Sequence, residues 1–240
     1  MKNKKAFITL LSSKDYWMST VILNESLKKT NSKYNLIVAV TEDILDKEII
    51  EIFDKHHILY VVIPVFKYSD STIESAKQRG FDTVLNTASK ICIFDLNYFD
   101  KLVYLDSDSI ILDNIDDLMD FPDGSMLYDG DPFSGLFVFN PKNHCTEMYK
   151  TILSHSMHFD GDMFSNLWFH VKDNLDYRID ISYFYPINRQ NNNNTKIKAV
   201  HFINKPKPWL VDIEEYTKHV NKHMDIVQYY YELKDKVNGK

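Results

Sequence analysis

Short β-prone runs alternate with amphipathic helical segments over the first 65 residues, and this alternation limits the possible folds more than any other feature. The pattern predicts three strands with two helices between them: strands at 6–11, 35–40 and 58–65, and helices at 16–29 and 46–55. Such alternation is typical of βαβ units, which build parallel sheets with helices on their faces. We therefore expect the N-terminal half of a nucleotide-binding α/β domain. A Gly-x-Gly-x-x-Gly fingerprint does not occur, so a dinucleotide is not indicated.

The rest of the chain continues without an internal repeat or a linker. Residues 66–83 are polar and broken, which predicts a loop or a mobile helix beside the binding site. Further elements are expected at these positions: helices at 87–95, 144–155 and from 159 to about 170, strands at 102–105, 110–112, 125–128, 134–140 and 199–203, and one terminal helix over 213–237. We therefore predict a single domain over residues 1–240.

The predicted strand at 102–105 is followed by two aspartates, Asp106 and Asp108, with Ser107 between them. In open α/β sheets, ligands bind beyond the carboxyl ends of the strands, so both carboxylates can reach the same cleft. Two neighbouring carboxylates repel each other unless a cation lies between them, and a hard divalent metal ion is their natural partner. An acidic loop without a ligand is the alternative interpretation.

Other proteins also carry an Asp-x-Asp pair after an apolar strand. Haloacid-dehalogenase-like phosphohydrolases use the first aspartate to attack phosphorus, but their motif usually lies on the first strand, whereas three predicted strands precede it here. A calcium loop needs glycine at its sixth position, where Ile111 stands. Nucleotide-sugar transfer is the third possibility, in which the aspartates hold Mn²⁺ or Mg²⁺ and the metal binds the donor diphosphate. That chemistry needs another metal ligand, a lysine near the phosphates and a carboxylate near the sugar.

A histidine-bearing stretch supplies such companions. His201 ends a predicted strand, and two lysines, two prolines and a tryptophan follow it. The stretch His201–Trp209 resembles the His-Phe-x-Gly-x-x-Lys-Pro-Trp motif of glycogenin-like enzymes in glycosyltransferase family eight. Further stretches are similar to other motifs of that family and occur in the same order: Ile8–Leu10 with Tyr16, Leu105–Asp108 followed by Asn114–Leu118, Ser134–Pro141, and Phe159–Asp162.

The resemblance implies a single Rossmann-like domain of the GT-A type that transfers a sugar from a UDP-linked donor with retention of configuration. It makes Asp106, Asp108 and His201 the ligands of Mn²⁺ or Mg²⁺. The residues implied to contact the donor are Leu10, Ser12 and Tyr16 in the uridine pocket, Lys207 and Lys90 at the phosphates, Arg79, and also Ser107, Ser134, Gly135 and Asn204. Asp162, together with Asp160 and Lys90, is implied to support the transfer itself. A glycan or protein acceptor and a homodimer are implied as partners.

Two departures from the family pattern lie on the sugar side. Phe133 stands where the family has asparagine, and Met163 stands where it has glutamine. These changes favour a donor sugar other than glucose. They also leave open a second hypothesis from another class, a catalytically silent protein that binds nucleotide sugars. The phosphohydrolase remains the third hypothesis.

Composition excludes other classes of partner. The formal net charge of −6 argues against a nucleic-acid surface, which requires a basic face. The two cysteines, Cys92 and Cys145, lack the spacing of a zinc site or a disulfide framework, so we expect a reducing compartment. The apolar run at 6–11 is too short for a signal-peptide core, and no run reaches membrane-spanning length. We therefore expect a soluble, cytoplasmic protein.

Overall fold

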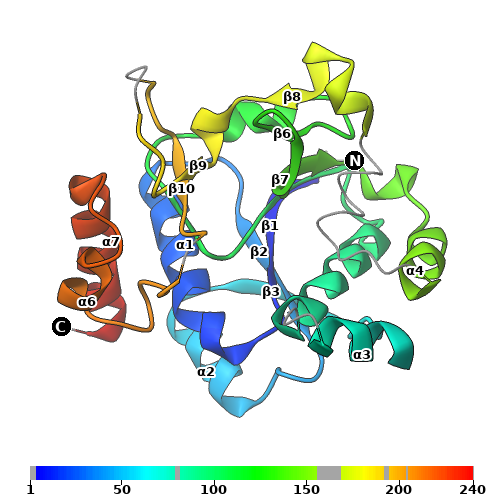
Figure 1. The fold of residues 1–240 in the computed structure, drawn as a ribbon, viewed down its shortest axis with the longest axis horizontal. Coiled ribbons are helices and arrows are strands. Elements are labelled where there is room, and N and C mark those ends of the chain that lie inside the picture. The colour runs from blue at the N-terminus through cyan, green and yellow to red at the C-terminus, as the bar shows by residue number, and fades with distance from the viewer. Residues whose placement is uncertain (1–3, 79–81, 156–168, 192–194, 204, 240) are drawn as a thin grey trace.

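A seven-stranded sheet forms the centre of the molecule (Figure 1). The computed structural model describes residues 4–78, 82–155, 169–191, 195–203 and 205–239. The strands of this sheet are β1 (Lys5–Leu11), β2 (Leu36–Thr41), β3 (Leu59–Ile63), β4 (Lys101–Leu105), β6 (Met126–Tyr128), β7 (Pro132–Phe139) and β8 (Arg178–Ile179), in the spatial order β3-β2-β1-β4-β7-β6-β8. The first four strands in that order run parallel, and β7 is antiparallel to both of its neighbours. The α/β fold with a mostly parallel sheet is therefore confirmed.

A second, smaller sheet joins the end of the chain to its middle. It contains β5 (Ser109–Ile111), β9 (Tyr185–Pro186) and β10 (Ala199–His201), with β10 in the centre. β10 is antiparallel to β5, and in this register His201 lies opposite Ser109. Because β5 begins just after the Asp-x-Asp pair, this register fixes His201 beside the two aspartates.

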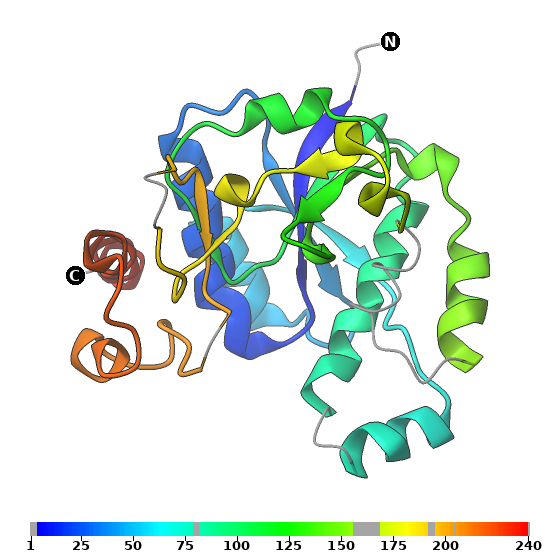
Figure 2. The same ribbon diagram turned by 45° about the horizontal axis from the view of Figure 1, so that its top comes forward.

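Helices cover both faces of the central sheet (Figures 1 and 2). The α-helices are α1 (Trp17–Lys29), α2 (Lys47–Lys55), α3 (Asp70–Gln78), α4 (Thr146–His155), α6 (Ile213–Thr217) and α7 (Met224–Asn238). The 3-10 segments are η1 (Lys14–Tyr16), η2 (Asp82–Asp95), η3 (Asp116–Asp120), η4 (Pro141–Asn143), η5 (Phe169–Lys172), η6 (Leu175–Tyr177) and η7 (Ile181–Tyr183). In Figure 1, α1 and α2 lie on one side of the sheet, and α3 and α4 lie on the other. Within the segment expected to be a loop or mobile helix, α3 forms a regular helix.

Successive side chains along a strand point to opposite faces of the sheet, so each strand contributes to the hydrophobic core on both sides. On β1, Ala6, Ile8 and Leu10 pack toward η2 and α4, whereas Phe7 and Leu11 belong to clusters on the side of α1. This is the period-2 pattern of a strand that is buried on both faces. The strand prediction for residues 6–11 therefore also identifies which side chains share a face.

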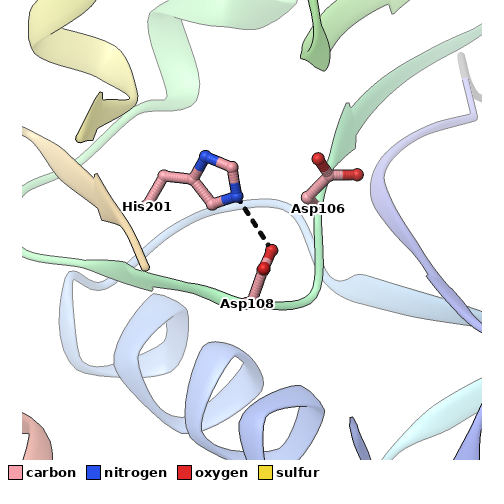
Figure 3. Close-up of side chains that lie close together, drawn as sticks. All are labelled: Asp106, Asp108 and His201. Carbon is pink, nitrogen blue, oxygen red and sulfur yellow. Dashed lines mark hydrogen bonds and ion pairs between the residues drawn. The ribbon is translucent and has the colours of Figure 1, made fainter. Parts of the chain in front are cut away.

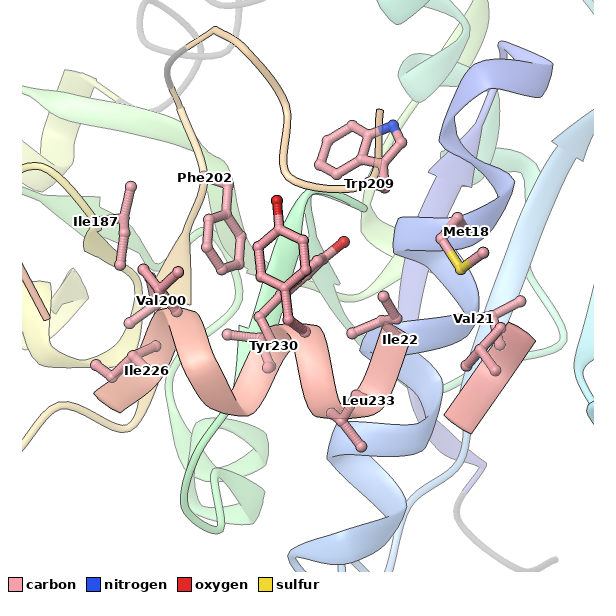
Figure 4. Close-up of a cluster of buried hydrophobic side chains, with 14 of the residues drawn as sticks. Met18, Val21, Ile22, Ile187, Val200, Phe202, Trp209, Ile226, Tyr230 and Leu233 are labelled. Atoms are coloured by element: carbon pink, nitrogen blue, oxygen red, sulfur yellow. The ribbon is translucent and has the colours of Figure 1, made fainter. Parts of the chain in front are cut away.

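The expectation of one terminal helix over 213–237 is wrong, because the structure divides this segment into α6 and α7. His223 adopts a left-handed backbone conformation with φ of 52°, which an α-helix cannot continue through. The division lets α7 pack its own apolar face against α1 and β10. Figure 4 shows Tyr230 and Leu233 of α7 facing Ile22 of α1, with Phe202 and Trp209 nearby.

Candidate active site

The Asp-x-Asp pair lies at the carboxyl end of β4, beside the carboxyl end of the neighbouring parallel strand β1. Two hydrogen bonds hold the backbone of Asp106. The Asp106 N–H donates to the Gly135 carbonyl at 2.9 Å, and the Ser109 hydroxyl donates to the Asp106 carbonyl at 2.8 Å. A Cβ atom on residue 135 would lie 2.9 Å from Asp106 Oδ2 and 2.4 Å from the Phe133 ring. Glycine at position 135 therefore leaves the space that the Asp106 carboxylate occupies.

His201 completes a group of three potential metal ligands (Figure 3). One ligand atom from each of Asp106, Asp108 and His201 lies within 4.8 Å of the other two. His201 Nε2 is 3.0 Å from Asp108 Oδ1. Two carboxylates and one imidazole fit Mn²⁺ well, because this ion accepts both hard oxygen ligands and imidazole nitrogen. The structure thus brings together the three residues that were predicted to bind metal.

Two nearly buried lysines neutralise the two aspartates. Lys90 Nζ lies 3.1 Å from Asp106 Oδ1 and 3.4 Å from the Ser134 carbonyl oxygen. Lys207 Nζ lies 2.7 Å from Asp108 Oδ2 and 2.6 Å from the Phe202 carbonyl oxygen. Only 4% of the Lys90 side chain and 10% of the Lys207 side chain are exposed. Buried cations and carboxylates require such partners, since an unpaired buried charge is very costly.

The electrostatics of the pocket follow from this pairing. Burial raises the pKa of Asp108, but the adjacent His201 and Lys207 outweigh burial and hold that pKa well below its usual range. For Tyr16, burial and then the negative charges of Asp108 and Asp106 raise the pKa to about 12. The Asp108 carboxylate thus remains ionised at neutral pH while the Tyr16 phenol remains protonated.

Aromatic side chains form the walls of the site. The His201 imidazole lies 4.6 Å from the Phe184 ring and 5.7 Å from the Phe133 ring, measured between centroids. Tyr16 packs against Trp209 with a centroid distance of 4.9 Å, and Lys207 Nζ lies 5.6 Å from the Trp209 ring. Trp209 is 6% exposed, so it forms part of the core rather than an open platform for a sugar.

Comparison with known proteins adds a second, independent line of argument. The model of the family described as "Glycosyl transferase family 8" matches residues 7–129 of this chain, which include Asp106 and Asp108. The chain belongs to glycosyl transferase family 8. This confirms the resemblance found in the sequence motifs. The matched region ends before His201 and Lys207, and it is the fold that brings these two residues next to Asp108.

The chain is also similar to curated proteins with different names. Human glycogenin-1 is 27% identical over 234 residues, which cover 90% of this chain and 65% of glycogenin-1. Galactinol synthase 3 of Arabidopsis thaliana is 33% identical over 125 residues, which cover 52% of this chain and 36% of the synthase. The chain thus spans about a third to two-thirds of the length of these relatives.

Solved structures agree with the family 8 fold. The galactosyltransferase LgtC, crystallised with donor and acceptor sugar analogs, matches with a TM-score of 0.61 at 11% identity, covering 96% of this chain and 95% of LgtC. The apo-form glycosyltransferase GlyE of Streptococcus pneumoniae TIGR4 matches with a TM-score of 0.60 at 15% identity, covering 96% of this chain and 60% of GlyE. At these identities the likeness concerns the fold, which confirms the expected GT-A architecture. None of the described helices is long and apolar enough to cross a membrane.

Several of the other residues predicted to contact the donor lie near the same edge of the sheet. The remaining ones lie outside the described residues. Leu10 is buried near the end of β1, and Ser12 follows that strand directly. Ser107 is buried between the two aspartates, and Ser134 lies on β7, which pairs with β4. The predicted residues that lie outside the described residues are Arg79, Asp160, Asp162 and Asn204.

Tyr104 is a site residue that the sequence analysis missed. Its hydroxyl donates to Asp106 Oδ1 at 2.9 Å, and Lys90 Nζ lies 4.6 Å from the centroid of its ring. Tyr104 and Asp106 are two positions apart, so in a strand they point to the same face. That spacing is visible in the sequence, where Tyr104 otherwise fits the pattern of a buried strand residue.

Proposed function

We propose that this chain is a metal-dependent, retaining glycosyltransferase that moves a hexose from a UDP-sugar to a glycan or protein acceptor. The observation that supports this most is the group formed by Asp106, Asp108 and His201 at the carboxyl edge of the sheet, in a chain of glycosyl transferase family 8. Parallel α/β sheets bind nucleotides at this edge. Retention rests on the family resemblance.

Asp106, Asp108 and His201 would hold Mn²⁺, or alternatively Mg²⁺. When bound, the ion supplies Lewis-acid stabilisation to the departing nucleoside diphosphate. Lys90 and Lys207 provide positive charge beside the aspartates, where it can balance the phosphate oxygens. We also propose that Asp160 and Asp162 act near the sugar.

The first test combines Mn²⁺ with a panel of UDP-sugars and measures both thermal stability and release of UDP. A donor present at a hundred times its Kd should stabilise the chain by about 2.7 kcal/mol, which a melting curve detects easily. The Asp106→Asn variant should lose more than about a hundredfold in UDP release, because it removes one metal-binding charge. Asp117→Asn is the matched control, since Asp117 pairs with Lys198 and Tyr183 elsewhere on the molecule.

Each outcome of this experiment discriminates between the hypotheses. Metal-dependent UDP release by the wild-type chain and the Asp117→Asn control, but not by Asp106→Asn, supports the transferase. Stabilisation by UDP-sugars without any release would identify the silent nucleotide-sugar-binding protein. Release of phosphate from simple phosphomonoesters, with no response to UDP, would identify the phosphohydrolase.

A further inference from the structure

Both oxygens of the Asp108 carboxylate are already engaged in the structure. Oδ1 lies 3.0 Å from His201 Nε2, and Oδ2 accepts a hydrogen bond from Lys207 Nζ at 2.7 Å. A metal ion that binds Asp108 must therefore displace one of these two neighbours. An ion held by His201 Nε2 and Asp108 Oδ1 replaces the contact between these two atoms, whereas Lys207 lies outside the ligand group and competes with the ion for the Asp108 carboxylate.

The charges of the pocket bear on both lysines. Asp106 and Asp108 carry two negative charges, and Lys90 and Lys207 carry two positive charges at ion-pair distance. A divalent cation added to this arrangement leaves an excess of two positive charges in a largely buried pocket. A nucleoside diphosphate brings negative charge that removes this excess, so each of the two ligands should strengthen the binding of the other.

Lys207 and Lys90 are held differently. Lys90 donates to the Asp106 carboxylate, whose Oδ1 also accepts the Tyr104 hydroxyl, and to the Ser134 carbonyl oxygen at 3.4 Å. Lys207, by contrast, follows β10 and donates to the carbonyl oxygens of Phe202 and Ile203 at 2.6 and 3.5 Å. Those carbonyls keep the ammonium group next to the site after it leaves Asp108, within reach of phosphates bound there.

We propose that Lys207 is an internal counter-ion that closes the metal site in the free chain and transfers from Asp108 to the diphosphate when metal and nucleotide bind together. This inference rests on the proposed function. It assigns Lys207 a second role, in which it lowers the affinity for metal alone and so couples metal binding to the presence of nucleotide.

The test measures Mn²⁺ binding directly, by the electron paramagnetic resonance signal of the free ion, without turnover. In the wild-type chain, UDP should tighten Mn²⁺ binding by about tenfold or more. In Lys207→Met, Mn²⁺ alone should bind about tenfold more tightly than in the wild-type chain, and UDP should add little. A role that is merely structural would weaken both ligands instead of changing them in opposite directions.

Three further variants make the result specific. Lys207→Arg keeps the positive charge, so its affinity for Mn²⁺ alone should stay near that of the wild-type chain. Lys90→Met removes an equal charge but leaves the contact between Lys207 and Asp108 in place, so it should gain less Mn²⁺ affinity than Lys207→Met. Lys198→Met, whose lysine pairs with Asp117, should behave as the wild-type chain does.

The possible failures are distinct. If the wild-type chain binds no Mn²⁺ even with UDP, the proposed function fails, and this inference fails with it. If the wild-type chain binds Mn²⁺ with UDP but Lys207→Met gains no affinity for Mn²⁺ alone, only the counter-ion role is overturned. Equal gains in Lys207→Met and Lys90→Met would indicate a general charge effect and would also overturn it.

Discussion

Tyr104 shares one oxygen of Asp106 with Lys90, and this contact restricts how the carboxylate can rotate. The hydroxyl donates to Oδ1 at 2.9 Å from a side chain that is only 1% exposed. Groups that orient a metal ligand commonly affect metal affinity or activity by 10–100-fold. Tyr104 therefore acts as a positioning residue for Asp106 in the proposed site.

The Tyr104→Phe variant tests this role with the smallest possible change. Loss of the hydroxyl should weaken Mn²⁺ binding in the presence of UDP by about tenfold, because Asp106 can then rotate more freely. Tyr183→Phe serves as the control, since it removes a hydroxyl that donates to Asp117 at 2.5 Å instead. The measurement is the affinity of each variant for Mn²⁺ in the presence of UDP. Equal affinities in the two variants would exclude a positioning role for Tyr104.

At the level of elements, α7 carries two adjacent tyrosines with opposite hydrogen-bonding situations. Tyr230 is 0% exposed, and its hydroxyl finds no hydrogen-bond partner among the described residues. The Tyr231 hydroxyl donates to the carbonyl oxygens of Val211 and Asp212 at 3.1 and 3.0 Å, tying α7 to the segment before α6. The two side chains therefore contribute differently to the attachment of this helix.

Replacing each of these tyrosines with phenylalanine should change stability in opposite directions. Tyr230→Phe should leave the free energy of unfolding unchanged or raise it by about 1 kcal/mol, because it removes a buried hydroxyl that lacks a partner. Tyr231→Phe should lower it by about 1 kcal/mol, because the hydrogen bonds from this hydroxyl to the Val211 and Asp212 carbonyls are lost. Urea unfolding curves measure both values. A clear loss of stability in Tyr230→Phe would show that its hydroxyl has a partner after all.

The elements that local patterns determine were predicted well. Strands β1, β2 and β3 and helices α1 and α2 lie close to their expected bounds, because each has a hydrophobic period of its own and a recognisable end. At the start of α2, for example, Asp46 accepts a hydrogen bond from the Ile49 N–H at 3.1 Å. The division between α6 and α7 was missed because it depends on the backbone of His223, whose side chain gives no such signal.

The same distinction applies to the candidate site. The Asp-x-Asp pair follows directly from a strand pattern and the rule for open sheets, so it was predicted from local sequence. His201 and Asp108 are 93 positions apart, and only the family motif suggested that they meet. The lysine pairs could not be assigned in advance, because the pairing of each ammonium group depends on how β4, β7, β10 and η2 pack.

For the molecule as a whole, several buried phenols predict the response to alkali. Burial raises the pKa of Tyr16 to about 12, and burial also raises the pKa values of Tyr216, Tyr230 and Tyr231 above the ordinary value of 10.0. The unfolded chain therefore loses these protons at lower pH than the folded chain. The stability that these groups contribute is complete below about pH 10 and is lost as the pH rises through the folded-state values.

This prediction can be checked by urea unfolding at several pH values between 8 and 12, together with tyrosinate absorbance near 295 nm. The free energy of unfolding should fall steadily above about pH 10, and part of the tyrosinate signal should appear only as the chain unfolds. Should all tyrosines ionise near pH 10 while the fold remains intact, the buried phenols would have no part in alkaline stability.

The pairing of β10 with β5 also bears on the order in which the site forms during protein synthesis. A ribosome adds about 5–20 residues per second, so His201 is joined to the chain about 5–20 s after Asp108. During that interval the nascent chain has its Asp-x-Asp pair but neither His201 nor Lys207. A chain whose translation stops before β10 would contain every residue that matches the family model and still lack the third proposed ligand and the proposed counter-ion of Asp108. If the proposed site binds metal, only chains whose translation has passed β10 contain all three of its ligands.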